Sequence, residues 1–113
     1  MDFNTYQTQS RASAEYPDIG DNFVYPVLGL VGEAGEVAEK IKKLMRDEAV
    51  FSPRAVSATA KQAITKELGD VLWYLAQLAT ELDVSLETVA TQNLEKLASR
   101  KDRGQIQGSG DNR

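Results

Sequence analysis

Residues 26–46 read PVLGLVGEAGEVAEKIKKLMR, and this stretch determines the kind of fold that the chain can adopt. Its apolar residues recur every three or four positions, at Val27, Leu30, Val31, Ala34, Val37, Ala38, Ile41, Leu44 and Met45. This spacing gathers them on one side of an α-helix. Pro26 suits the first turn of such a helix, and the basic residues Lys42, Lys43 and Arg46 near its end complement the helix dipole. The stretch therefore predicts an amphipathic helix over about 26–46.

Three other segments are expected to be helical, and no segment convincingly indicates a strand. They span about residues 3–16, 59–82 and 86–101. Asp2 and Ser85 are suitable N-caps for the first and last of them. Within the connection 47–57, Ser52 followed by Pro53 could begin a short helix. Amphipathic helices joined by short connections predict an all-α, four-helix bundle-like fold.

The expected organisation is one domain over residues 1–103, followed by a flexible tail over 104–113. A chain of 113 residues is long enough for a single modest core. Four helices, one of them short, make that core thin, so association with further copies is expected to bury the remaining apolar faces. The tail RGQIQGSGDNR is glycine-rich and polar, so any order in it must come from contacts with a ligand or a partner chain.

Composition excludes several kinds of chemistry. The chain has no cysteine and no histidine, so disulfides, zinc–thiolate sites, cysteine nucleophiles and Ser-His-Asp triads are impossible. The net charge of −4 disfavours nucleic-acid binding, which needs a basic surface. Neither a signal peptide nor an apolar run long enough to cross a membrane is visible, so a cytoplasmic protein is the expectation.

Two pairs of acidic residues share one spacing. Glu33 and Glu36 lie in GEAGEV, and Glu67 and Asp70 lie in KELGDV, each pair with a glycine before its second acid. At about 100° per residue, both pairs lie at similar angles to the apolar stripes of their helices, the first stripe being centred near Ala34. If the two helices pack antiparallel with these stripes facing, all four carboxylates converge. The alternative is that the acids are simply solvated, but the matched pairs and the nearby helical glycines, which allow close approach, favour convergence.

Four carboxylates without histidine or thiolate would form an all-oxygen site. Such a site suits Mg²⁺, with Mn²⁺ as a possible substitute, and fits zinc poorly. Magnesium commonly bridges protein carboxylates and substrate phosphates. The pattern therefore indicates metal-assisted phosphoryl chemistry.

The chain resembles the MazG-like nucleoside triphosphate pyrophosphohydrolases, which are all-α enzymes marked by Glu-x-x-Glu followed by Glu-x-x-Asp. The matching segments are GEAGEVAEKI, KELGDVLWYLAQLATELDVSLE and NLEKLASR, and together they span about residues 25–103. The gap between the two acidic pairs is longer than the family pattern suggests, which leaves the geometry of the connection open. The resemblance implies Mg²⁺-dependent hydrolysis of (deoxy)nucleoside triphosphates to monophosphate and pyrophosphate, with a role in nucleotide-pool housecleaning. It also implies a homodimer or homotetramer whose sites lie between helices of different chains.

The resemblance assigns roles to individual residues. Glu33, Glu36, Glu67 and Asp70 are the expected metal-binding and catalytic acids. Asn93, Lys96 and Arg100 match an Asn-x-x-Lys-x-x-x-Arg pattern and are candidates to bind the substrate, although the two cations could merely complement the dipole of the last helix.

Four further side chains could contribute to binding, although for Trp73 packing in the core or in a dimer is the better interpretation. Trp73 and Tyr74 could stack on a base, and Gln7 and Arg11 could close over a ligand.

Two other functions stay open. The chain could be a non-catalytic helical oligomer that keeps the fold but binds metal structurally or binds a partner. It could also be an enzyme of the same class that cleaves a dinucleotide or a modified nucleotide.

Overall fold

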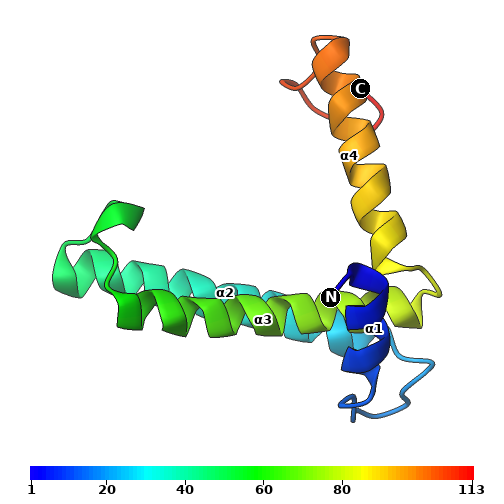
Figure 1. Cartoon of the computed structure of the whole chain (residues 1–113), viewed down its shortest axis with the longest axis horizontal. Helices are drawn as coiled ribbons and strands as arrows, with labels where there is room; N and C mark the ends of the chain where they lie inside the picture. The colour runs from blue at the N-terminus through cyan, green and yellow to red at the C-terminus, as the bar shows by residue number, and fades with distance from the viewer.

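The computed structural model describes all 113 residues, and its regular secondary structure is entirely helical (Figure 1). Its elements are α1 (Phe3–Arg11), α2 (Val24–Glu48), the short 3₁₀ helix η1 (Pro53–Ala55), α3 (Ala58–Glu81) and α4 (Leu86–Asp102). The all-α fold class is confirmed, and so is the short helix that begins at Pro53.

Side-chain caps explain where most of the helices begin. The carboxylate of Asp2 accepts a hydrogen bond of 2.7 Å from the backbone N–H of Thr5, and the hydroxyl of Ser85 accepts one of 3.0 Å from Thr88. Ser57 caps α3 in the same way. These bonds satisfy backbone donors that the first turn of a helix leaves free.

The first helix is shorter than predicted, because α1 ends at Arg11 and does not continue to residue 16. The chain turns after this point, and the indole N–H of Trp73 donates a hydrogen bond of 3.0 Å to the hydroxyl of Ser13. The turn also brings the phenol of Tyr16 onto the carboxylate of Glu81 at the end of α3. Contacts with α3 therefore override the local helical tendency of residues 12–16.

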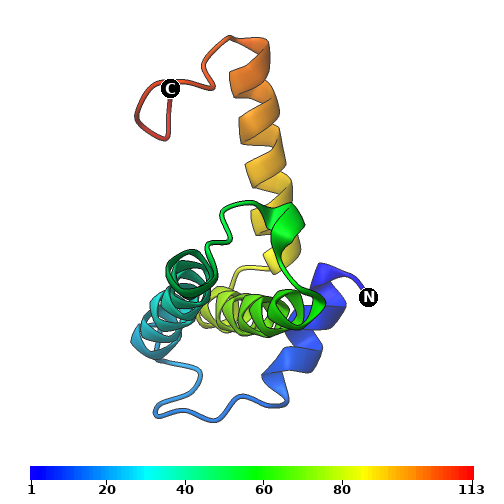
Figure 2. The same ribbon diagram turned by 90° about the vertical axis from the view of Figure 1, so that its left-hand side faces the viewer.

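Two long helices form the frame of the molecule. Helices α2 and α3 run antiparallel, side by side, and α1 crosses α3 near one end, on the side away from α2 (Figures 1 and 2). Helix α4 leaves the same end and projects away from the pair, so the chain has the shape of an L (Figure 1). It contacts α1 and α3 but not α2.

Helix α2 does not face α3 with the centre of its apolar stripe near Ala34. The expected orientation of α2 about its own axis is therefore wrong. Its more sheltered positions are Leu30, Glu33, Val37, Lys40 and Leu44, whereas Val31, Ala34, Ala38, Ile41 and Met45 are exposed. Glu33 thus lies toward α3, and an apolar stripe is left on the outer side of α2. A cavity of about 390 Å³ continues this apolar surface onto Leu68 of α3.

A single copy of the chain buries little of its own surface. Only 8 of 113 residues are buried, and the accessible surface is 8092 Å². A compact protein of 12.4 kDa would expose about 6,100 Å². The radius of gyration is 17.1 Å, against about 13 Å for a compact domain of this length. The chain therefore exposes roughly 2,000 Å² more than a self-sufficient domain of its mass.

None of the helices combines the length and the apolar character that a membrane crossing would require.

Candidate functional site

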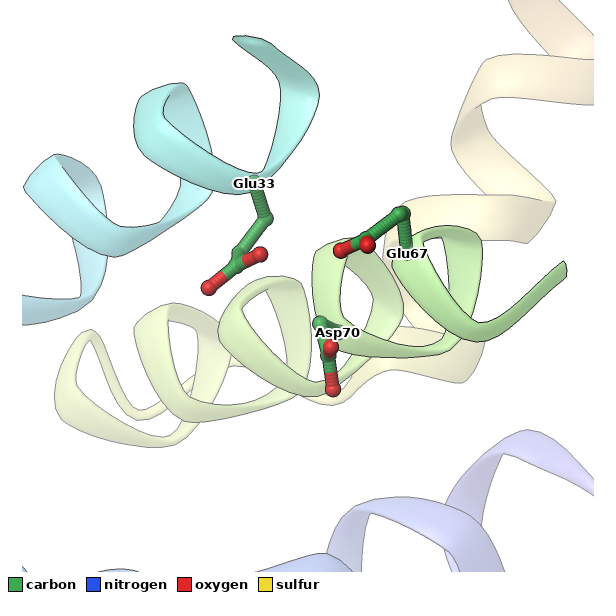
Figure 3. Close-up of side chains that lie close together, drawn as sticks. All are labelled: Glu33, Glu67 and Asp70. Carbon is green, nitrogen blue, oxygen red and sulfur yellow. The ribbon is translucent and has the colours of Figure 1, made fainter. Parts of the chain in front are cut away.

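Three carboxylates converge between α2 and α3. Glu33 on α2 and Glu67 and Asp70 on α3 each offer one oxygen, and these oxygens all lie within 4.8 Å of one another. Figure 3 shows the three side chains directed toward a common space between the two helices. We call these three residues the acid cluster. From the sequence, four carboxylates were expected to converge if the apolar stripes of the two helices faced each other. Three of the four lie together, although the stripes do not face each other.

The acid cluster is electrostatically unfavourable by itself. Partial burial raises the pKa of Glu33, and the negative charges of Asp70, Glu67 and Glu36 raise it further. Like charges held this close favour the protonated form of one member. A bound cation would remove this repulsion, so the arrangement gains from a positive charge between the three acids.

The donor set fits a hard divalent cation. Oxygens that coordinate one Mg²⁺ at 2.0–2.1 Å lie at most about 4.2 Å apart in octahedral geometry. The separations in the acid cluster, within 4.8 Å, exceed this limit only slightly. Rotation of exposed carboxylates such as Asp70 covers such a difference. Residues Glu33, Glu67 and Asp70 are therefore the ones that could hold a metal.

Glu36 is not part of the acid cluster. It lies one turn after Glu33 on α2 and is exposed. Its charge still contributes to the raised pKa of Glu33, so it belongs to the same electrostatic environment.

A lysine on α2 accompanies the acid cluster and was not singled out by the sequence. The ammonium of Lys40 lies 3.1 Å from a carboxylate oxygen of Glu67. Lys40 follows Glu33 by seven residues, two turns along the same side of the helix. This heptad spacing is the signal that could have identified it.

Two aromatic side chains border the acid cluster. Burial raises the pKa of Tyr6 and of Tyr74, and the charge of Asp70 raises both further. Tyr74 packs against Gly29 of α2 so closely that a Cβ atom at that position would overlap its ring. The predicted close approach of the helices thus occurs at Gly29, while the space beside Gly32, Gly35 and Gly69 is open.

The structure does not bring the predicted substrate-binding residues to the acids of the same chain. Asn93, Lys96 and Arg100 lie on α4, which projects away from α2 and α3 (Figure 1). Asn93 is exposed, whereas Arg100 is only 5% exposed.

The C-terminal segment folds back on these α4 cations. Arg100 donates a hydrogen bond of 2.6 Å to the carbonyl of Asp111, and the carboxylate of Asp111 lies 3.6 Å from both Lys96 and Arg100. Arg113 donates to the carbonyls of Gln105, Ile106 and Gly110. The Nε atom of Arg100 is buried without a partner. The predicted flexibility of residues 104–113 stays a prediction.

Gln7 and Arg11 make contacts within the chain, and their closing over a ligand stays a prediction. Gln7 donates to the hydroxyl of Thr80 and to the carbonyl of Val84. Arg11 donates to Tyr16 and Gln77. Both side chains thus fasten α1 to the end of α3.

The carboxylate of Glu81 organises the loop between α1 and α2. Burial would raise the pKa of Glu81, but hydrogen bonds from Tyr16, Gly20, Arg11 and Asn22 lower it to about 2. Tyr16 in turn stacks on Tyr25 with ring centroids 4.9 Å apart. Trp73 meets Tyr74 edge to face, which supports the packing role for Trp73.

Comparison with known proteins agrees with this site. The profile of the MazG nucleotide pyrophosphohydrolase domain matches residues 26–104, which include the three acids of the cluster. The chain is also similar to the "Gene 37 protein" of Mycobacterium phage L5, with 49% identity and complete coverage of both chains. No solved structure shows significant similarity. Since the domain match covers more than half of the sequence, the chain belongs to the MazG nucleotide pyrophosphohydrolase family.

Proposed function

We propose that this protein hydrolyses (deoxy)nucleoside triphosphates to nucleoside monophosphates and pyrophosphate with the help of Mg²⁺, for which Mn²⁺ can substitute. The observation that carries the proposal is the convergence of Glu33, Glu67 and Asp70 between two helices of a chain from this family. The biological role that fits is removal of unwanted nucleotides from the cytoplasmic pool.

Glu33, Glu67 and Asp70 would hold the metal, and Glu36 would complete the set from the next turn of α2. A metal held there would supply Lewis-acid chemistry for the hydrolysis of a phosphoric anhydride. The carboxylates themselves fix its position and supply the negative charge that retains it. Any carboxylate oxygen left free can accept a hydrogen bond from the attacking water and so orient it.

In this proposal the functional protein is an oligomer of at least two copies of the chain. The excess exposed surface of roughly 2,000 Å² per chain, or about 4,000 Å² for two chains, lies in the range of total area that obligate homodimer interfaces bury, about 2,000–5,000 Å². The outer apolar stripe of α2 supplies the kind of surface that a homodimer, or a dimer of dimers, would cover. Lys96 and Arg100, which lie away from the acids of their own chain, could then meet the phosphates bound by another copy. Asn93 could contact the sugar or a phosphate from the same face.

The direct test is a panel of canonical, oxidised and methylated nucleoside triphosphates, with monophosphate and pyrophosphate quantified separately. Wild-type protein with Mg²⁺ is expected to release both products from at least one of them in equal amounts. The Glu67→Gln variant keeps the shape of the side chain but loses a charged ligand, so kcat is expected to fall at least a hundredfold, about 2.7 kcal/mol. Its thermal unfolding should stay close to that of the wild type.

Glu39→Gln is the matched control, because Glu39 lies on α2 outside the acid cluster and pairs with Lys42 and Lys43. Its activity is expected to stay within about twofold of the wild type, since surface pairs contribute little. A folded wild-type protein that leaves the whole panel intact would favour the non-catalytic alternative, a helical oligomer that binds metal or a partner. Dinucleotides belong on the panel, because they test the other alternative.

A further inference from the structure

Lys40 is the one cation that pairs with a member of the acid cluster. Its ammonium lies 3.1 Å from Glu67, and the two side chains are only 34% and 19% exposed. The neighbouring Lys42 and Lys43 pair instead with Glu39 on their own helix, and their side chains are more than half exposed. Lys40 is thus the only lysine of α2 that connects it to α3 by an ion pair.

The ion pair occupies an acid that the proposed metal also needs. A carboxylate oxygen of Glu67 that accepts from an ammonium has reduced capacity to ligate a cation, and the two positive charges repel each other. Lys40 also lines a cavity of about 300 Å³ between α2 and α3, which leaves room for its side chain to change conformation. Residues Ala63 and Ile64, one turn before Glu67, form part of the same cavity. The Lys40 side chain is therefore free to release Glu67 by rotation about its own bonds.

We infer that Lys40 changes its ionic partner when metal and substrate bind. In the ligand-free protein it neutralises Glu67, and once Glu67 ligates the metal it binds a substrate phosphate. A triphosphate brings several negative charges into the site, and a lysine ammonium is a common ligand for them. The exchange would couple metal occupancy to triphosphate binding, because the phosphate-binding cation becomes free only when Glu67 is engaged. This inference rests on the proposed function of the acid cluster.

The first measurement is a calorimetric titration of the metal-free protein with Mn²⁺. Lys40→Met retains most of the aliphatic stem and removes the charge. Because the ammonium that competes with the metal for Glu67 is then absent, the Kd of this variant for Mn²⁺ is expected to be about three- to tenfold lower than that of the wild type.

The second measurement is steady-state hydrolysis of the best triphosphate at saturating Mg²⁺. Lys40→Met is expected to raise KM about tenfold or more, because one charge-assisted contact with the phosphates is lost. The value of kcat should change less than about threefold. Lys40→Arg keeps a cation and should restore much of the KM.

Lys43→Met is the matched control, because Lys43 lines the same cavity but pairs with Glu39. It should leave both the Mn²⁺ affinity and KM at the wild-type values. Lys40→Gln serves in the same way as Lys40→Met if the methionine variant does not fold.

The possible failures are distinguishable. If the wild type neither binds Mn²⁺ nor hydrolyses a triphosphate, the proposed function fails and the inference fails with it. If the wild type does both and Lys40→Met resembles it in Kd and KM, the inference alone is overturned. Weaker Mn²⁺ binding by Lys40→Met would also overturn it, because Lys40 would then be holding Glu67 in place for the metal and not competing with it.

Discussion

At the scale of single residues, two buried or half-buried carboxylates are held in opposite electrostatic states. Partial burial and the charges of three other acids raise the pKa of Glu33, whereas four hydrogen bonds lower the pKa of Glu81 to about 2. Glu33 lacks the donors that Glu81 has, and it therefore gains from an added cation. Glu81 is already satisfied and acts as an anchor.

Glu81 gives a prediction about acid stability. Its pKa of about 2 in the folded chain lies below the ordinary value of 4.5. The ionised form therefore stabilises the fold fully above about pH 4.5, and this stabilisation is lost as the pH falls toward 2. The difference corresponds to a contribution on the order of 2–3 kcal/mol to the free energy of unfolding at neutral pH.

Glu81→Gln should lower stability at pH 7 and should flatten the decline between pH 4.5 and pH 2. Urea unfolding at a series of pH values measures both effects. Glu95→Gln, at an exposed site on α4, is the control and should change neither. An unchanged pH profile in Glu81→Gln would contradict the anchoring role.

At the scale of elements, the packing of α2 on α3 depends on a glycine and an aromatic ring. The Tyr74 ring occupies the space where a side chain at Gly29 would lie. This contact sets how closely the helices approach near the acid cluster, because Glu33 and Asp70 are each one turn from one of the partners.

Gly29→Ala should therefore destabilise the protein and weaken Mn²⁺ binding, since either Tyr74 or the whole of α2 must move. Gly32→Ala is the control, because nothing lies within 4 Å of its added Cβ atom. Alanine improves helix propensity by about 1 kcal/mol over glycine, so this variant should unfold at a higher temperature. Thermal unfolding compares the two, and a Gly29→Ala variant as stable as Gly32→Ala would contradict the packing described.

Most elements and part of the site were predictable from sequence. Helical periodicity and caps such as Asp2 and Ser85 predicted the four helices. The matched spacing of the acids predicted that four carboxylates would meet, and all of them except Glu36 do. These features are local or follow from the angle of 100° per residue.

Other features depend on tertiary contacts that the spacing does not encode. The early end of α1 follows from contacts of Ser13 and Tyr16 with α3. The rotation of α2 was predicted wrongly, because periodicity shows that an apolar stripe must be covered but not by which partner. The Lys40–Glu67 pair depends on that rotation and was missed for the same reason.

At the scale of the whole molecule, the exposed apolar surface supports the proposed self-association. Val31 is 67% exposed and Leu28 is 66% exposed, although both are apolar and lie on the longest helix. Helix α4 also projects into solvent with Leu94 and Leu97 exposed (Figure 1). A second copy of the chain would cover surfaces of this kind by burying apolar area.

Light scattering coupled to size exclusion should give at least twice the chain mass of 12.4 kDa. Val31→Asp places a charge on the outer face of α2 and should weaken self-association at least tenfold. Asn4→Asp, which adds the same charge at an exposed position in the first turn of α1, should not. A stable monomeric wild type at micromolar concentration would contradict the proposed assembly.

The most direct test of the acid cluster is anomalous scattering from crystals soaked in Mn²⁺. A peak is expected within about 2.5 Å of carboxylate oxygens of Glu33, Glu67 and Asp70, and Glu67→Gln crystals should lose most of it. Saturated crystals with no peak between α2 and α3, and with these carboxylates turned separately toward solvent, would contradict the account.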